Sequence, residues 1–299
     1  MDERGELASN VTDVALIFEG GGMRVAHSAG VVSTLLEAGI HFDFVAGISA
    51  GSSCTVNYLS RDSRRAKLSF VEFAADPNFG SVWTFLQGKG WFNAHYIYEE
   101  TGGPGQALPF DFGTFAANPA QCRIGSFECD TGQSVYWTKD DLATLPALMR
   151  RVRASSTMPI LMPPVEIDGR TYVDGALGPC GGFAIDAARA AGFTRFFVVM
   201  SREREYRKEP NKWPWLFRAW FRKFPAVAEA VNERWKNYNR TREELFDLQS
   251  SGEACLFIPE RMMVSNSTVE VAKLQASYDD GLAQAQRELP RWREFLEMV

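Results

Sequence analysis

The chain has 299 residues, of which 45% are hydrophobic and 23% charged, and its formal net charge is −5. Such a chain is long and apolar enough for one domain with a large buried core, and its acidic balance argues against a nucleic-acid-binding surface. No stretch approaches the roughly 20 apolar residues of a membrane span, and the charged segment 1–7 lacks the apolar run of a signal peptide. We therefore expect a cytoplasmic protein with a single domain over 1–299.

The first predicted unit is a strand, a glycine loop and a helix. Residues 14–18 are all apolar and predict a buried strand, and the periodic apolar pattern after the loop predicts a helix that ends near Ala38. The loop itself contains Gly20, Gly21 and Gly22. Consecutive glycines allow backbone amides to point into a concave nest, and such a nest binds an anion.

The sequence around this loop restricts the kind of anion. A dinucleotide site would require a glycine where Val25 stands and an acidic residue after the second strand, and a nucleotide phosphate site would require a Gly-Lys-Ser/Thr ending. Because none of these is present, we expect no dinucleotide. The remaining candidate is the oxyanion of a tetrahedral acyl intermediate. Arg24 would stabilise either the loop or the negative charge of this oxyanion.

The second unit contains a pentapeptide that is typical of a nucleophile elbow. Residues 47–51 read Gly-Ile-Ser-Ala-Gly, after an apolar run at 42–46 and before a predicted helix at 52–60. In such a turn, small neighbours leave the serine hydroxyl exposed, and the N-terminal dipole of the helix stabilises negative charge on it. Ser49 is therefore the candidate nucleophile.

The pentapeptide alone has a second interpretation. Glycines such as Gly47 and Gly51 also flank serine in ordinary tight turns. The neighbouring glycine loop favours the nucleophile interpretation, because it would supply the amides that such a nucleophile needs.

The three histidines restrict the choice of a base for Ser49. They are His27, His41 and His95, and no histidine follows in the remaining two thirds of the chain. A triad with a late histidine, as in α/β-hydrolases, is therefore excluded. We expect His27 to be a packed or solvated helix residue and His41 to lie in a loop.

A carboxylate is the alternative base, and Asp174 is the candidate. Two short alternating segments are joined at Asp168-Gly169, a dipeptide typical of hairpin turns, and Asp174 ends the second segment. It is followed by Gly175 and Ala176. A turn residue is the other interpretation of this aspartate.

Together these motifs resemble the patatin-like phospholipases, lipid acyl hydrolases with a Ser-Asp dyad and no histidine base. The glycine loop with Arg24, the elbow around Ser49 and Asp174-Gly175-Ala176 occur in the family's order, and 154–159 resembles the segment before its aspartate. Val25 is a departure, because many relatives have glycine there.

The resemblance implies a three-layer α/β/α sandwich with a mainly parallel central sheet. It also implies that Ser49 attacks an ester, that Asp174 accepts its proton, and that amides of the glycine loop hold the oxyanion. We expect partial burial to raise the pKa of Asp174, since a solvated carboxylate is a poor base. No calcium-loop pattern or histidine cluster is present, so we expect neither a metal nor a cofactor.

The rest of the chain predicts further elements of an alternating α/β fold. Residues 62–130 are less regular and are expected to be an insertion that frames a cleft, and 201–299 to be a helical C-terminal elaboration. Further strands are predicted at 134–137, 196–200 and 256–258, and helices at 183–191, 226–248 and 267–295.

Segment 213–224 mixes tryptophan and phenylalanine with arginine and lysine. This composition is typical of a helix at a membrane interface. A core-packing helix whose basic residues reach solvent is the alternative. In the first case the protein is peripheral to the inner face of the membrane.

The sequence thus favours a serine hydrolase that cleaves carboxylic esters of phospholipids or related lipids. A catalytically inactive lipid- or acyl-binding protein on the same fold is the alternative from another class. A nucleotide-binding oxidoreductase would leave Ser49 unexplained. The lipid class, the ester position, the acyl preference and the oligomeric state do not follow from the sequence.

Overall fold

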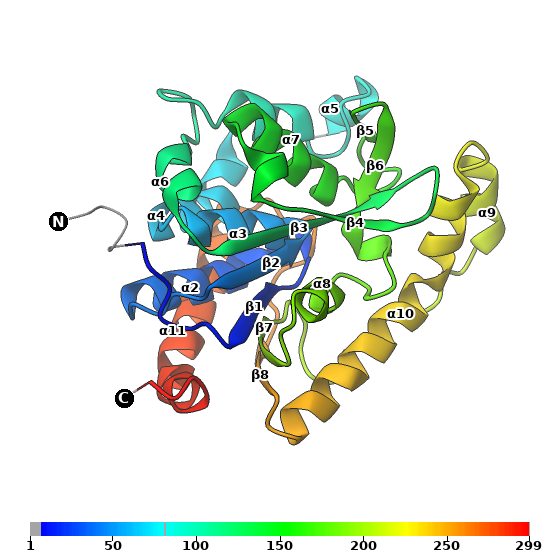
Figure 1. Cartoon of the computed structure of the whole chain (residues 1–299). Coiled ribbons are helices and arrows are strands. Elements are labelled where there is room, and N and C mark those ends of the chain that lie inside the picture. Colours follow the sequence, from blue (N-terminus) through cyan, green and yellow to red (C-terminus); the bar gives the residue numbers. More distant parts are fainter. Residues whose placement is uncertain (1–6, 81, 299) are drawn as a thin grey trace.

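The structure is a computed structural model that describes residues 7–80 and 82–298 (Figure 1). In this part of the chain, eight strands form one sheet in the order β5-β6-β3-β2-β1-β7-β8, and β4 also pairs with β3. Strands β1, β2, β3, β7 and β8 are parallel to their neighbours in this core, whereas β4, β5 and β6 are antiparallel additions. The strands are β1 (Val14–Phe18), β2 (Phe44–Ile48), β3 (Gln121–Glu128), β4 (Ser134–Trp137), β5 (Val165–Ile167), β6 (Arg170–Asp174), β7 (Arg195–Val199) and β8 (Ala254–Phe257).

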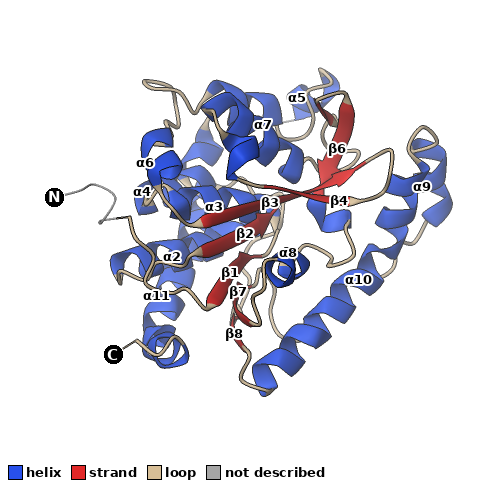
Figure 2. Cartoon of the chain, in the orientation of Figure 1, coloured by secondary structure: helices blue, strands red, loops and turns tan. Residues whose placement is uncertain are grey.

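Helices cover both faces of this sheet (Figure 2). The α-helices are α2 (Val25–Glu37), α3 (Ala50–Leu59), α4 (Ser63–Phe70), α5 (Val82–Leu86), α6 (Phe112–Ala117), α7 (Leu145–Ser156), α8 (Ile185–Ala190), α9 (Pro214–Trp220), α10 (Pro225–Ser250) and α11 (Val271–Phe295). Short 3-10 or π turns lie at η1 (Gly22–Arg24), η2 (Glu72–Ala75), η3 (Tyr96–Glu100), η4 (Lys139–Leu142) and η5 (Gly175–Leu177). Of the helices described, none combines the length and the apolar composition that crossing a membrane requires.

The central strands are apolar on both faces, as parallel strands between two helical layers must be. In β1, Leu16 and Phe18 pack into the core that contains α2, α3, α7 and α11, whereas Ala15 and Ile17 pack toward α8 and α10. Successive residues of a strand point to opposite faces, so one five-residue strand contributes to two cores. The expected three-layer α/β/α sandwich with a mainly parallel sheet is confirmed.

Helices α2 and α11 pack closely, side by side, on one face of the sheet (Figure 1). A Cβ atom on Gly30 would lie 2.4 Å from the backbone nitrogen of Leu282, and one on Gly281 would lie 2.2 Å from the carbonyl oxygen of His27. Only glycine permits this approach of two backbones. The C-terminal helix is therefore part of the layer that carries the glycine loop.

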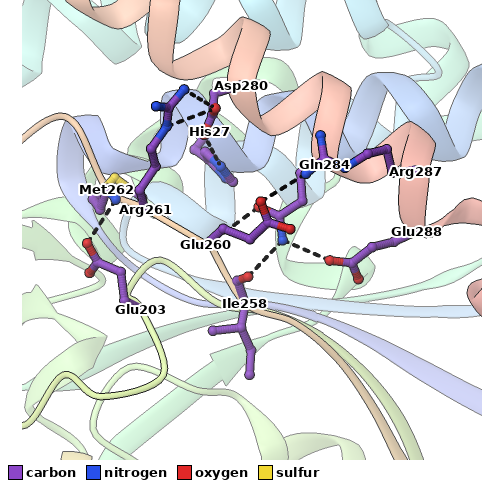
Figure 3. A network of polar contacts seen from close by, with 10 residues as sticks. All are labelled: His27, Glu203, Ile258, Glu260, Arg261, Met262, Asp280, Gln284, Arg287 and Glu288. Atoms are coloured by element: carbon purple, nitrogen blue, oxygen red, sulfur yellow. Dashed lines mark hydrogen bonds and ion pairs between the residues drawn. The ribbon is translucent and has the colours of Figure 1, made fainter.

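Polar contacts surround this helix pair (Figure 3). Asp280 of α11 accepts hydrogen bonds from Arg261, the shorter at 2.7 Å, and its other oxygen lies 3.5 Å from Nε2 of His27. Gln284 donates to the carbonyl of Ile258 at 2.8 Å. These contacts fix the segment after β8 against α2 and α11.

Most predicted elements are present within a few residues of their expected bounds. Strand β1, strand β4 and the hairpin of β5 and β6 have the expected limits. The strand expected at 42–46 lies two residues later, and the last long helix begins at Val271 rather than at 267. Segment 1–6, at the charged start of the chain, lies outside the described residues.

One region differs from its expected character. The supposedly irregular stretch 62–130 includes β3, a central strand of the sheet, as well as α4 and α6. The C-terminal part 201–299 contains its helices and the edge strand β8, which begins two residues before the strand predicted at 256–258. Both regions therefore belong to the sandwich as well as to its periphery.

Candidate active site

Ser49 lies in a sharp turn between β2 and α3, as the elbow interpretation requires. Its backbone has φ 58° and ψ −134°, a conformation that non-glycine residues adopt rarely. A Cβ on Gly47 would lie 2.3 Å from the carbonyl oxygen of Gly51, and one on Gly51 would lie 2.3 Å from that of Phe18. The small residues of the pentapeptide are therefore required by backbone crowding.

Strand β3 brings Ser49 and Asp174 together. Its Gly125 is paired with Ile48, the residue before Ser49, and its next residue, Ser126, is paired with Asp174. Strand β2 ends at Ile48 and β6 ends at Asp174, opposite these two consecutive residues of β3. The ends of two strands that are distant in sequence thus meet at adjacent positions.

The two side chains make direct contact. Ser49 Oγ donates a hydrogen bond to Asp174 Oδ2 at 2.7 Å, and Asp174 Oδ1 accepts one from the backbone amide of Ala176 at 2.9 Å. Ser49 is 7% exposed and Asp174 5%. Gly175 is needed for this packing, because a Cβ there would lie 2.5 Å from the carbonyl oxygen of Gly125.

Burial raises the pKa of Asp174 above its ordinary value of 3.8. The positive charges of Arg234 and Lys208 and the hydrogen bond from Ser49 act in the opposite direction without cancelling the effect of burial. The expected direction of this shift is confirmed. A carboxylate with a raised pKa is a stronger proton acceptor than a solvated one.

The glycine loop lies directly against the serine. A Cβ on Gly20 would lie 2.8 Å from that of Ser49, and Gly22 has φ +57°. The amide of Gly20 donates to the carbonyl of Gly182 at 3.2 Å, so it is already engaged. Within the described part of the chain, the amides of Gly21 and Gly22 donate no hydrogen bond and remain available.

Arg24 is oriented toward a different group of charges. Burial, followed by repulsion from Arg202, lowers its pKa to about 10, while Glu19 and Tyr238 act in the opposite direction. Arg24 is absent from the cavity wall beside Ser49. This position fits the expected bracing of the loop better than direct contact with an oxyanion.

All three histidines have their contacts away from the serine. His27 is buried beside Asp280 and the ring of Phe257. His41 contacts Arg61 at 2.5 Å, and His95 contacts Glu100 at 2.7 Å. The exclusion of a histidine base therefore agrees with the geometry of the described chain.

An apolar cavity opens beside Ser49. Its wall consists mainly of aliphatic and aromatic side chains from α3, α4, α7 and the region between α4 and α6. It includes Val56, Phe70, Phe79, Phe92, Ile97, Leu108, Met149, Val152, Met158 and Met162. Such a surface suits a hydrocarbon chain.

Sequence reasoning missed several residues around the pair. Ser155 Oγ accepts the backbone amide of Ser49 at 2.9 Å and donates to the carbonyl of Gly125 at 2.5 Å. The segment 154–159 was noted only for its resemblance to the family. Lys208 and Arg234, which act on Asp174, lie in a loop and a helix whose sequences carry no recognisable signal. In the described residues, no group of three or more His, Cys, Asp or Glu side chains is arranged to hold a metal ion.

The family model described as "Patatin-like phospholipase" matches residues 16–180, more than half of the chain and all of the motifs above. The chain belongs to the patatin-like phospholipase family. A second model, a domain of unknown function (DUF6363), matches residues 224–297, which contain α10, β8 and α11 of this patatin-like protein.

Curated relatives each match between about half and two thirds of this patatin-like chain. The uncharacterized protein YjjU of Escherichia coli (strain K12) is 25% identical over 166 residues, 55% of this chain and 45% of that protein. Lysophospholipase nte1 of Aspergillus fumigatus is 28% identical over 186 residues, 62% of this chain and 12% of that protein. Lysophospholipase NTE1 of Phaeosphaeria nodorum is 28% identical over 162 residues, which are 54% of this chain and 10% of that protein. The match thus spans less than half the length of these relatives.

Among solved structures, VipD from Legionella pneumophila has a similar fold. The TM-score is 0.51 at 11% sequence identity, over 93% of this chain and 67% of that one. At this identity the likeness concerns the fold.

Proposed function

We propose that this protein is a serine lipid acyl hydrolase that cleaves carboxylic esters of phospholipids or related lipids. The observation that carries the proposal is the 2.7 Å hydrogen bond from Ser49 Oγ to the buried Asp174 Oδ2, beside an apolar cavity. Family membership supports the same activity. In this role the protein takes part in lipid degradation.

In the proposed mechanism, Ser49 Oγ attacks the ester carbonyl as Asp174 accepts its proton. The tetrahedral intermediate carries its negative charge near the available amides of Gly21 and Gly22. When it collapses, the alcohol leaves with the proton from Asp174, and the acyl group remains on Ser49. Asp174 then takes a proton from water, which attacks the acyl-enzyme, and returns this proton to Ser49 Oγ as the fatty acid leaves.

The geometry supports this order of steps through the environment of each group. Asp174 has a raised pKa and touches the hydroxyl that it must deprotonate. Ser49 precedes the N-terminus of α3, whose dipole stabilises an alkoxide. The apolar cavity gives the acyl chain a place to bind on the Ser49 side.

Labelling with a fluorophosphonate separates this proposal from an inactive binding protein. We expect covalent capture of the native protein at Ser49, no capture of Ser49→Ala, and turnover over a panel of lipid esters. A folded native protein that neither reacts with the probe nor hydrolyses any ester of the panel would favour the binding protein instead.

We also propose that α9 docks the enzyme on a lipid surface. Trp213, Trp215 and Trp220 are 61%, 65% and 62% exposed, and Leu216 is 42% exposed, whereas Phe217 and Phe221 pack against a core on the other side. Trp220 shares a surface hollow with Phe85, next to the exposed Leu86 of α5. Exposed apolar patches with neighbouring cations are typical of interfacial surfaces.

The test replaces Trp213, Trp215 and Trp220 by serine. Phe221 is left unchanged because it is 8% exposed and packs in a core. We expect weaker co-sedimentation with phosphatidylglycerol vesicles and slower hydrolysis of vesicle lipids, with unchanged hydrolysis of a short water-soluble ester. Unchanged vesicle binding would reject the docking proposal and leave the hydrolase proposal intact.

A further inference from the structure

A second cavity lies next to the apolar one, at the Asp174 end of the Ser49–Asp174 pair. Its volume is about 410 Å³, ample for several water molecules or a small polar group. Asp174 is part of its wall, and Met158 belongs to the walls of both cavities. The other side chains that matter for its chemistry are Tyr206, Lys208, Glu209, Asn211, Arg234 and Asn266.

Two cations of this wall have no ionic partner in the described part of the chain. Neither Lys208 nor Arg234 forms an ion pair there, and Arg234 Nε is buried without a hydrogen-bond partner. Polar groups in such positions are normally paired. Glu209, the other carboxylate of the wall besides Asp174, is exposed.

More positive charge lies behind the wall. Burial, followed by repulsion from Arg234, Arg24 and Arg202, lowers the pKa of Lys208 to about 7. Glu19 attracts it, as Asp174 also does, but Glu19 already accepts hydrogen bonds from Tyr238 and from the backbone of Ser201. Holding like charges together costs free energy, and a bound anion would relieve that cost.

The backbone that carries Lys208 is held in place by α10. Asn239 Oδ1 accepts the amide of Lys208 at 2.9 Å, and Asn239 Nδ2 donates to the Lys208 carbonyl at 2.9 Å. Asn211 donates to the carbonyl of Val231 at 2.8 Å. The segment with Lys208 is therefore tied at both ends to the helix that provides Arg234.

The two cavities meet the reacting pair at different residues, and only the second has Lys208 and Arg234 in its wall, beside apolar side chains such as Leu161, Phe217 and Trp235. An ester whose carbonyl carbon lies at Ser49 can place its acyl chain in the apolar cavity, and its alcohol portion then extends past Asp174 into the cationic one. The alcohol portion of a phospholipid carries a phosphate.

We propose that Lys208 and Arg234 bind the phosphate of the substrate's headgroup. This inference rests on the proposed hydrolase function, and it assigns phosphate-bearing lipid esters as the preferred substrates over neutral glycerides. Arg24 and Arg202 contribute from behind by keeping the cavity positive.

The test compares two esters that differ in the phosphate. They are 1-octanoylglycerol 3-phosphate and 1-octanoylglycerol, each used below its critical micelle concentration. We expect the native enzyme to hydrolyse the phosphate ester with the higher kcat/KM. Lys208→Gln should reduce this preference about tenfold, and Lys208→Gln with Arg234→Gln should reduce it further.

The ratio of the two kcat/KM values, phosphate ester over neutral ester, isolates the contribution of headgroup binding. Loss of a cation also changes the basicity of Asp174, but both esters use the same Asp174, so that change cancels in the ratio. Lys236→Gln is the matched control, because Lys236 is an exposed cation of α10 that pairs with Glu233. An equal kcat/KM for the two native substrates, or a preference that the double variant retains, would overturn the proposal.

Inorganic phosphate distinguishes a headgroup site from a site for free phosphate. Competitive inhibition of octanoylglycerol hydrolysis, weakened by Lys208→Gln, supports the cavity as the binding place. Inhibition by phosphate without any preference for the phosphate ester would instead indicate a site for the free ion. If neither ester is hydrolysed, calorimetric binding of octanoylglycerol phosphate to Ser49→Ala still tests the cavity, while the fluorophosphonate probe and the ester panel decide the proposed function.

Discussion

The backbone amide of Ser49 donates a hydrogen bond to the side chain of Ser155 at 2.9 Å, and this bond ties the elbow to α7. Ser155 in turn donates to the carbonyl of Gly125 in β3, the strand whose register brings the serine and the aspartate together. Since the Ser49 backbone has an unfavourable conformation, it needs such external support.

Ser155→Ala should therefore impair turnover more than stability. We expect kcat to fall about 10- to 100-fold, because the hydroxyl of Ser49 loses its alignment, and the free energy of unfolding to fall by about 1 kcal/mol. Ser33→Ala is the control, since Ser33 is also a buried helical serine, hydrogen-bonded to Tyr278 at 2.9 Å. Equal kcat in the two variants would show that Ser155 only stabilises the fold.

Asp174→Asn should lower the activity without lowering the stability of the protein. An amide cannot accept the proton of Ser49, so we expect turnover to fall by at least about 10²-fold. The raised pKa means that ionised Asp174 destabilises the native state, and that this penalty develops as the pH rises from 3.8 through the native pKa. At neutral pH the variant should thus melt at an equal or higher temperature than the native protein.

The pH dependence of turnover in the native enzyme is a second test of Asp174. Turnover should decline as the pH falls through the raised pKa of Asp174, because the protonated carboxyl is no base. Kinetics with a soluble ester and thermal melting over the same pH range are the measurements. A melting temperature that falls in Asp174→Asn at neutral pH would contradict the assigned burial penalty.

Local signals in the sequence were sufficient for the motifs and for several strands. Ser49 could be found because crowding at Gly47 and Gly51 restricts the residues around it, and β1 because all five of its residues are apolar. The turn at Asp168-Gly169 has both residues at positive φ, 52° and 77°, as its dipeptide predicts. In each case the structural requirement concerns neighbours in sequence.

Long-range requirements left no such signal. Strand β3 contains the polar residues Gln121, Arg123, Ser126 and Glu128 without strict alternation, and its importance comes from pairing with three other strands. Ser155 is 106 residues from the amide that it accepts. Lys208 and Arg234 are ordinary cations until the fold brings them beside Asp174. Pairing and proximity of this kind are properties of the folded chain.

Gly51→Ala tests the crowding at the elbow. A Cβ there would lie 2.3 Å from the carbonyl oxygen of Phe18, which is backbone and cannot move aside easily. We expect a loss of about 3 kcal/mol or more in the free energy of unfolding, together with loss of activity. Chemical denaturation measures the loss in the free energy of unfolding.

Gly113→Ala is the matched control for this substitution. Gly113 lies in α6, and the nearest atom to its added Cβ is Asp111 Oδ1 at 3.4 Å. Alanine is the better helix former, so we expect a gain of about 0.5–1 kcal/mol. Equal effects at the two glycines would mean that the close approach at the elbow does not require glycine.

His27 should make the protein sensitive to mild acid. Burial lowers its pKa below the ordinary 6.5 although Asp280 acts in the opposite direction, so the native state holds it neutral. The unfolded chain binds a proton below pH 6.5, and stability is therefore present above that pH and is lost as the pH falls toward the native pKa. His41 acts likewise, since burial and Arg61 lower its pKa to about 4.

The measurement is the melting temperature between pH 7.5 and 5 for native protein and for His27→Asn. The variant should show a smaller decrease over this interval, whatever its absolute stability, because it has one group fewer to protonate on unfolding. An equal slope in His27→Asn and the native protein would mean that Asp280 offsets the burial of His27, and that the polar cluster of Figure 3 accommodates the charged ring.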